Sequence, residues 1–214
     1  MSHFLLFNFY LMIKSIIFDL GNVLIYWDPK NLFNETYFDS IDKRDYFLSA
    51  ICTDAWNEMQ DAGRSISEAT RDMIRQYPDW EPAIRDYYGR WTEMLNGPIK
   101  ESVEVLRQLK ESQKYKLYAL TNWNACLFEI ALARYDFLDW FDGRIVSGEE
   151  KIRKPDEKFY KILEERYGVV PGEALFIDDN LRNIKAAKGF GYHTIHFHSG
   201  KELMEELTLG KLIE

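Results

Sequence analysis

The chain has 214 residues, with 35 acidic against 27 basic side chains and a formal net charge of -8. This acidic balance leaves no basic stripe for a phosphate backbone, so nucleic acid is not expected as a partner. The length suits one large domain or a core with a substantial insertion. Cys52 and Cys126 lack metal-ligand spacing, which favours reduced thiols in a cytoplasmic protein.

The N-terminal run from Phe4 to Ile13 is apolar but lacks the basic region and the cleavage site of a signal peptide. It is also too short to span a bilayer, so no membrane partner is expected. A second start at Met12 would make residues 1–11 a dispensable extension.

The first predicted strand is the apolar run from Ile16 to Phe18, which ends at Asp19 and breaks at Gly21-Asn22. An apolar run between turn residues is typical of a strand covered on both faces. Asp19 would emerge at the carboxyl end of this strand as a candidate nucleophile. A simple turn or helix cap is the alternative that this stretch alone leaves open.

Helical periodicity replaces the strand pattern between residues 26 and 95. Capping residues ahead of apolar-periodic stretches predict helix starts at Asp28-Pro29, Asp42, Thr53, Ser65 and Asp79. Ser65 and Glu68 have capping-box spacing. We predict an all-helical insertion whose aromatic side chains serve mainly in packing.

From Asn96-Gly97-Pro98 onwards, strand and helix patterns alternate. The predicted helices cover about residues 99–111, 123–134, 155–167, 181–188 and 201–209, and the predicted strands 116–121, 144–147, 174–178 and 193–197. Such alternation predicts an α/β fold, a parallel sheet with helices on both faces. The ligand site of such a sheet lies at the carboxyl ends of the strands, where Thr121 and Ser147 would emerge.

A second acidic strand end follows, because the apolar run 174–177 leads into Asp178-Asp179. Beside Asp19, these side chains would repel one another unless a cation balanced them. Their oxygen ligands suit Mg²⁺.

A histidine triple, His193, His196 and His198, also invites a metal interpretation. An extended strand would place His196 and His198 on one face and His193 on the other, which argues against a metal site there.

Four separated motifs together resemble the haloacid dehalogenase (HAD) superfamily, in its phosphatase branch with a helical cap. They are Phe18-Asp19-Leu20-Gly21-Asn22-Val23, Leu120-Thr121-Asn122, Arg153-Lys154-Pro155 and Ile177-Asp178-Asp179-Asn180. The resemblance covers nearly the whole chain from Lys14. It implies a Rossmann-like core of residues 1–25 and 96–214 and a helical cap domain of residues 26–95.

The resemblance also implies how a phosphoryl group would be bound. Asp19 would be the nucleophile that forms an aspartyl-phosphate, Thr121 and Lys154 would hold the phosphoryl oxygens, and Asn122 and Trp123 would contact the substrate. Thr121 also precedes a predicted helix, whose N-terminal N–H groups would complete an anion site. Base rates leave open a helix-capping Thr121 and a surface Lys154, with its neighbours Lys151 and Arg153 as competing cations.

The implied metal ligands are Asp178, Asp179, the Asp19 carboxylate and the Gly21 carbonyl. A dianionic phosphate repels a carboxylate nucleophile, so a metal ion and a lysine are needed to neutralise its charge. The implied activity is Mg²⁺-dependent hydrolysis of a small phosphate ester.

Gly21 departs from the family pattern, which usually has a second Asp there as general acid and base. Losing such a group typically costs about 10²- to 10⁴-fold in rate. Three explanations stay open: a leaving oxygen that needs little protonation, another acid such as Asp28 or a cap residue, or weak catalysis. The Asp-Leu-Gly-Asn variant is similar to a subgroup that includes sugar-1-phosphate phosphatases.

Two other functions stay open. A 2-haloacid dehalogenase also lacks the second acid, but it needs no metal, and Asp178-Asp179 beside Asp19 would then only raise the pKa of the nucleophile. A weakly active or non-catalytic phosphate-binding regulatory protein is the other alternative, and Gly21 is its only support.

Overall fold

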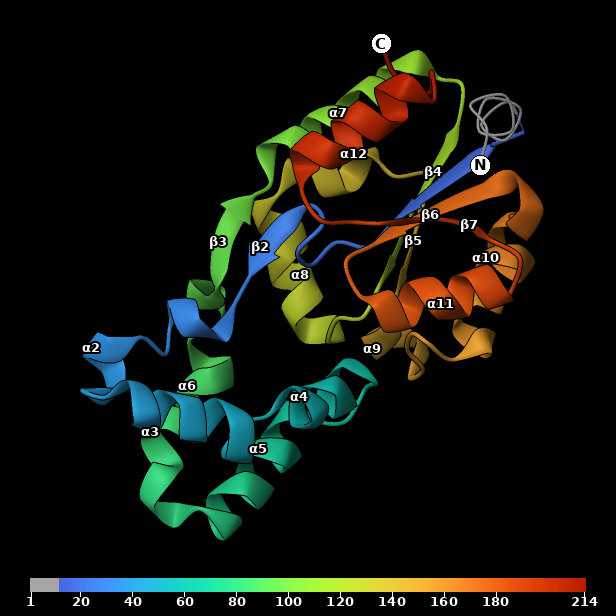
Figure 1. The fold of residues 1–214 in the computed structure, drawn as a ribbon. Coiled ribbons are helices and arrows are strands. Elements are labelled where there is room, and N and C mark those ends of the chain that lie inside the picture. Colours follow the sequence, from blue (N-terminus) through green and yellow to red (C-terminus); the bar gives the residue numbers. More distant parts are fainter. Residues whose placement is uncertain (1–11) are drawn as a thin grey trace.

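The computed structural model describes residues 12–214, and the predicted dispensable extension, residues 1–11, lies outside the described residues. Its centre is a five-stranded parallel sheet of order β5-β4-β1-β6-β7 (Figure 1). The strands are β1 Ser15–Phe18, β4 Lys116–Thr121, β5 Gly143–Val146, β6 Ala174–Asp178 and β7 His193–His196. The predicted α/β fold is confirmed.

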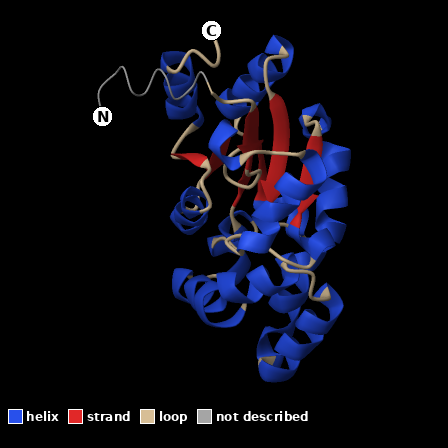
Figure 2. Ribbon diagram, turned by 90° about the vertical axis from the view of Figure 1, so that its right-hand side faces the viewer, coloured by secondary structure: helices blue, strands red, loops and turns tan. Residues whose placement is uncertain are grey.

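Helices cover both faces of this sheet (Figure 2). Ile16 and Phe18 of β1 belong to one hydrophobic cluster and Ile17 to the other, and all three are fully buried. The first face carries α7 Lys100–Ser112, α8 Ala125–Arg134 and α12 Gly200–Leu209; the second carries α10 Glu157–Tyr167 and α11 Leu181–Gly189. Burial on both faces explains why β1 shows no polar alternation.

Helices make up most of residues 28–94. They are α2 Glu35–Phe38, α3 Ile41–Tyr46, α4 Asp54–Asp61, α5 Ile66–Gln76 and α6 Glu81–Gly89. Two short antiparallel strands, β2 Ile25–Trp27 and β3 Leu95–Pro98, join this helical part to the rest (Figure 1). Tyr26 therefore lies in a strand, where helices alone were predicted. Strands this short, paired across the whole helical part, leave too little local periodicity to detect.

Side-chain caps explain where several helices begin. Thr53 accepts a hydrogen bond from the Trp56 N–H, and Ser65 from the Glu68 N–H, as predicted. The start predicted at Asp42 is wrong, because Ser40 caps α3. Asp79 lies in a 3-10 turn ahead of α6, and Asp28 caps a 3-10 turn. Ser and Asp both cap helices, so spacing alone does not choose between nearby candidates.

The aromatic side chains of the helical part pack against one another, as predicted. The buried ring of Phe33 lies 4.8 Å from Phe47 and 5.9 Å from Tyr87, measured between centroids. None of the helices between residues 12 and 214 combines the length and apolar character needed to cross a bilayer.

Candidate active site

Asp19 and Asp178 lie side by side because β1 and β6 are neighbouring parallel strands. Phe18 pairs with Ile177, and the Asp19 N–H donates to the Ile177 carbonyl at 2.8 Å. Carboxylate oxygens of Asp19, Asp178 and Asp179 lie within 4.8 Å of one another. The structure thus brings together the three carboxylates that the sequence singled out, at the carboxyl ends of the strands.

Lys154 is fully buried and its ammonium group lies between two of these acids. The Nζ atom is 2.9 Å from Asp19 Oδ1 and 2.7 Å from Asp178 Oδ2. Asn122 fixes the backbone of Lys154, since its Oδ1 accepts from the Lys154 N–H at 2.8 Å and its Nδ2 donates to the Lys154 carbonyl at 3.1 Å. Of the competing cations, Lys151 is exposed and Arg153 forms an ion pair with Glu58.

Burial dominates the electrostatics of the cluster. Burial raises the pKa of Asp19 well above its usual range; Lys154 opposes this shift, while Asp178 and Asp179 add to it. Burial also raises the pKa of Asp179, and the charge of Asp178 adds to that shift. For Lys154 burial alone would lower the pKa, but Asp178 and Asp19 outweigh it and raise the pKa. One ammonium therefore faces three carboxylates, which suits a second cation.

The chemistry of the cluster fits Mg²⁺. Every candidate ligand side chain in it offers oxygen, with no sulfur or nitrogen, and Mg²⁺ prefers carboxylate oxygens. Among the described residues this is the only group of three or more acidic, histidine or cysteine side chains placed to hold a metal ion. His196 instead contacts the Asp179 carbonyl through Nε2 at 2.9 Å, and its ring faces His198 with centroids 4.3 Å apart.

Asn183 is a contributor that the sequence argument missed. It is buried at the start of α11, and its Nδ2 donates to both Asp178 oxygens, at 3.2 and 3.1 Å. The Asn180 N–H adds a third hydrogen bond to Asp178, at 2.7 Å. These donors stabilise the charged carboxylate and fix its orientation. An Asn in the first turn of the helix after the acid pair was the available signal.

Thr121 ends β4, is 1% exposed, and its Oγ1 has no hydrogen-bond partner among the described residues. A buried hydroxyl without a partner is costly, and an anion's oxygen would satisfy it. Of the N–H groups that follow Thr121 in the predicted anion site, three have partners within the protein. Asn124 caps α8 by accepting from the N–H groups of Cys126 and Leu127, and the Trp123 N–H donates to Ser147 Oγ at 2.9 Å.

The end of α4 docks directly on the strand ends of the core. The Asp61 carbonyl accepts from Ser147 Oγ at 2.6 Å, and the Gln60 carbonyl accepts from Asn124 Nδ2 at 3.0 Å. Glu58 of the same helix forms ion pairs with Arg153 and Arg182. Because these partners lie far away in sequence, no local pattern predicted this contact.

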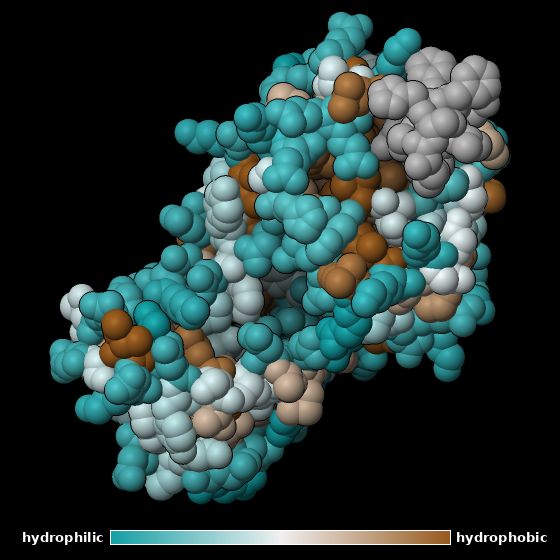
Figure 3. All heavy atoms as spheres, viewed as in Figure 1, coloured by the Kyte–Doolittle hydropathy of each residue, from teal (hydrophilic) through white to brown (hydrophobic). Residues whose placement is uncertain are grey.

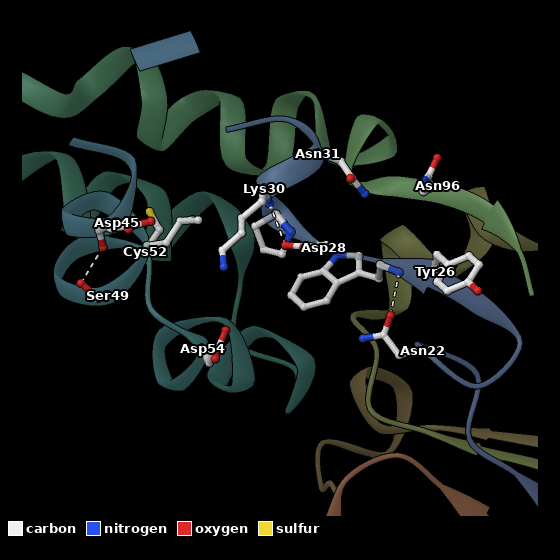
Figure 4. Close-up of a pocket in the computed structure, with 13 residues that line it drawn as sticks. Asn22, Tyr26, Asp28, Lys30, Asn31, Asp45, Ser49, Cys52, Asp54 and Asn96 are labelled. Atoms are coloured by element: carbon white, nitrogen blue, oxygen red, sulfur yellow. Dashed lines mark hydrogen bonds between the residues drawn. The ribbon is translucent and has the colours of Figure 1, made fainter. Parts of the chain in front are cut away.

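Two cavities lie where the helical part meets the core. A small one of about 100 Å³ is lined by Gly21, Trp27, Asn57, Asp61, Trp91, Asn122, Trp123 and Leu127. A larger one of about 780 Å³ starts at Asn22 and runs along the helical part (Figure 4). Figure 3, viewed as in Figure 1, shows a recess between the helical part and the core.

Most residues around the larger pocket are polar. They include Asn22, Tyr26, Asp28, Lys30, Asn31, Asp45, Ser49, Asp54 and Asn96 (Figure 4). Asp28, one of the candidates for a substitute acid, is exposed here, and its Oδ1 accepts from the Lys30 N–H at 2.8 Å.

The parallel α/β sheet thus presents a carboxylate, a buried lysine and an acid pair at the edge where such sheets bind their ligands. The chain belongs to the haloacid dehalogenase-like hydrolase family, whose model matches residues 13–191.

Three relatives are similar in sequence to this chain, and two of them are phosphatases. A sesquiterpene phosphatase of Aspergillus oryzae is 27% identical over 86% of this chain and 89% of its own length. A D-ribitol-5-phosphate phosphatase of Bacteroides thetaiotaomicron is 24% identical over 92% of this chain and 98% of its own length. A drimenol cyclase of Aspergillus calidoustus is 24% identical over 92% of this chain, which spans only 36% of that protein.

A solved structure agrees with the fold. A HAD family enzyme of Bacteroides thetaiotaomicron, crystallised with magnesium and inorganic phosphate, is 27% identical and superimposes with a TM-score of 0.64. The match covers 88% of this chain and 96% of that enzyme.

Proposed function

We propose that the protein is a Mg²⁺-dependent phosphatase that hydrolyses a small phosphate monoester through phosphorylated Asp19. The observation that carries this proposal is the cluster at the sheet edge. There the Asp19 carboxylate is paired with a buried lysine, two further carboxylates lie beside it, and the Thr121 hydroxyl lacks a partner. The phosphatases among the relatives, and the magnesium and phosphate bound to a similar enzyme, support it.

Each residue has a separate task in this reaction. An oxygen of Asp19 attacks phosphorus while the bond from phosphorus to the leaving oxygen breaks, and water then hydrolyses the aspartyl-phosphate. Lys154 and Thr121 donate hydrogen bonds to the phosphoryl oxygens as charge shifts among them. Asn122 holds Lys154 in place through its backbone.

The metal would be held by Asp178, Asp179, the Asp19 carboxylate and the Gly21 carbonyl. When bound, Mg²⁺ neutralises charge on the phosphoryl oxygens and lets an anionic nucleophile approach. Asn183 and the Asn180 N–H keep Asp178 turned toward this position.

We propose that the substrate is a phosphorylated sugar. The polar side chains around the larger pocket, such as Lys30, Asn31 and Asn96, suit a leaving group with several hydroxyls. We also propose that residues 26–95 act as a cap domain that selects the substrate over a core of residues 1–25 and 96–214. The two free thiols, Cys52 and Cys126, support a cytoplasmic location.

Chelating divalent metal should abolish phosphatase activity, and adding Mg²⁺ should restore it, because three acids without a metal repel the phosphate. The measurement is phosphate release with EDTA and after Mg²⁺ is returned, with halide release from 2-haloacids followed in parallel. No halide is expected. Halide release that persists in EDTA would favour the dehalogenase alternative. Tight phosphate binding without turnover would favour the regulatory one.

Trp123→Ala should change the ranking of substrates more than the metal dependence. Trp123 lines the small cavity with Gly21, while its buried ring packs on Trp91 and Phe128 with centroids 5.6 and 5.8 Å away. The readout is kcat/KM over a panel of sugar phosphates and nucleotides, with Mg²⁺ titrations. The control is Trp140→Ala, because Trp140 lines neither cavity. An unchanged ranking would remove Trp123 from the site.

A further inference from the structure

We propose that Asp61 of the helical part is the general acid and base that replaces the missing carboxylate at Gly21. The inference rests on the proposed phosphatase function and assigns the proton transfers that this function requires. The sequence left the position open between Asp28, a cap residue and no acid at all.

Asp61 and the position of the missing acid share one cavity. Asp61 and Gly21 line the same cavity of about 100 Å³, together with Asn122 and Trp123 of the second motif. A Cβ atom built on Gly21 would meet no atom within 4 Å. Gly21 therefore has room for a side chain, and Asp61 of the helical part lines the same cavity.

Hydrogen bonds hold both the backbone and the side chain of Asp61 in place. Its carbonyl accepts from Ser147 Oγ of the core, and its Oδ2 accepts from Asn57 Nδ2 at 3.0 Å. The side chain of Asn57 is fixed in turn, because its Oδ1 accepts a hydrogen bond from the Tyr88 hydroxyl at 2.9 Å, which a rotation would break. A proton-transfer group has to be positioned in this way to be effective.

The acidity of Asp61 supports the same role. Burial raises its pKa to about 7, against the Asn124 N–H and Arg153, which lower it, and with Glu58, which raises it. A carboxyl group with a pKa near neutrality can be protonated for one step and deprotonated for the next. Asp28, by contrast, is exposed and caps a turn through the Lys30 N–H.

The proton balance of the reaction closes with Asp61 alone. In the first step the proton of the Asp61 carboxyl moves to the leaving oxygen as its bond to phosphorus breaks and the Asp19–phosphorus bond forms. In the second step water attacks phosphorus, its proton moves to the Asp61 carboxylate, and the Asp19–phosphorus bond breaks. Phosphate leaves and Asp61 is protonated again.

The test compares two probes of similar shape, p-nitrophenyl phosphate and p-nitrobenzyl phosphate, in single turnover with Mg²⁺. The nitrophenolate leaves without a proton, whereas the benzyl alkoxide needs one. Asp61→Asn should slow the benzyl ester by about 10²- to 10⁴-fold and the phenyl ester by less than about tenfold. A thermal melt of each variant checks that the fold is retained.

Gly21→Asp in the Asp61→Asn background should restore the benzyl ester rate by at least about tenfold, because it places a carboxyl in the same cavity. Asp28→Asn tests the other candidate acid, and its ratio of phenyl to benzyl rates should stay that of the wild type. Equal losses on both probes in Asp61→Asn would mean a structural role and overturn the inference.

Retention of the benzyl rate in Asp61→Asn would also overturn the inference, and a selective loss in Asp28→Asn would then assign the acid to Asp28. Failure of the proposed function would look different. The wild type would then hydrolyse neither probe in the presence of Mg²⁺, and that result would overturn both the phosphatase function and the role of Asp61.

Discussion

Asp19→Asn should reduce phosphatase turnover by about 10⁴-fold or more, because the amide has the shape of the carboxylate but is not a nucleophile. The fold should survive. The side chain is nearly buried at the end of β1, and an amide oxygen can still accept the 2.7 Å hydrogen bond from the Leu20 N–H and face Lys154 Nζ. The measurements are single-turnover phosphate release, acid-stable labelling of the protein by phosphate, and thermal melting.

The matched control is Asp42→Asn, an exposed Asp on α3 that lines neither cavity. Its turnover should equal that of the wild type. If purified Asp19→Asn hydrolysed substrate at the wild-type rate, the aspartyl-phosphate mechanism would be wrong.

Lys154→Met should both abolish turnover and destabilise the fold. The methionine keeps most of the volume but leaves Asp19 and Asp178 buried without their shared counter-ion. Removing one partner of a buried ion pair costs about 3–5 kcal/mol in the free energy of unfolding. For a chain of this size that corresponds to a melting temperature lower by about 6–20 °C. Mg²⁺ should recover part of the loss, because a metal ion can neutralise the same carboxylates.

Unfolding is best followed by denaturant titration with and without Mg²⁺. Lys185→Met, an exposed lysine on α11, is the control and should change the free energy of unfolding by less than about 0.5 kcal/mol. A Lys154→Met protein as stable as the control in EDTA would show that the two carboxylates are not charged in the folded state, and the proposed role of Lys154 as their counter-ion would be lost.

The α/β core was predictable because its signals are local. Ile16 to Phe18 form an apolar run because both faces of β1 are buried, and the same holds for the strand before Asp178. Parallel strands end at a common edge, so acids placed after two such strands lie at that edge, and here they meet because β1 and β6 are neighbours. Lys154 was selected by its place in a motif, and its complete burial between two acids could not be read from the chain.

By itself, the sequence determined the sheet, the positions of the carboxylates, Thr121 and Lys154, and the absence of a side chain at Gly21. Only the tertiary structure decided which other groups contact these residues. Asn183 donates to Asp178, three of the N–H groups after Thr121 donate to Ser147 and Asn124, and Asp61 lines the cavity beside Gly21. Each of these contacts depends on a single polar side chain, whether its partner is five residues away, as for Asn183 and Asp178, or on another segment. Such contacts create no periodicity along the chain, and the docking of α4 on the strand ends is what brings Asp61 to the cavity.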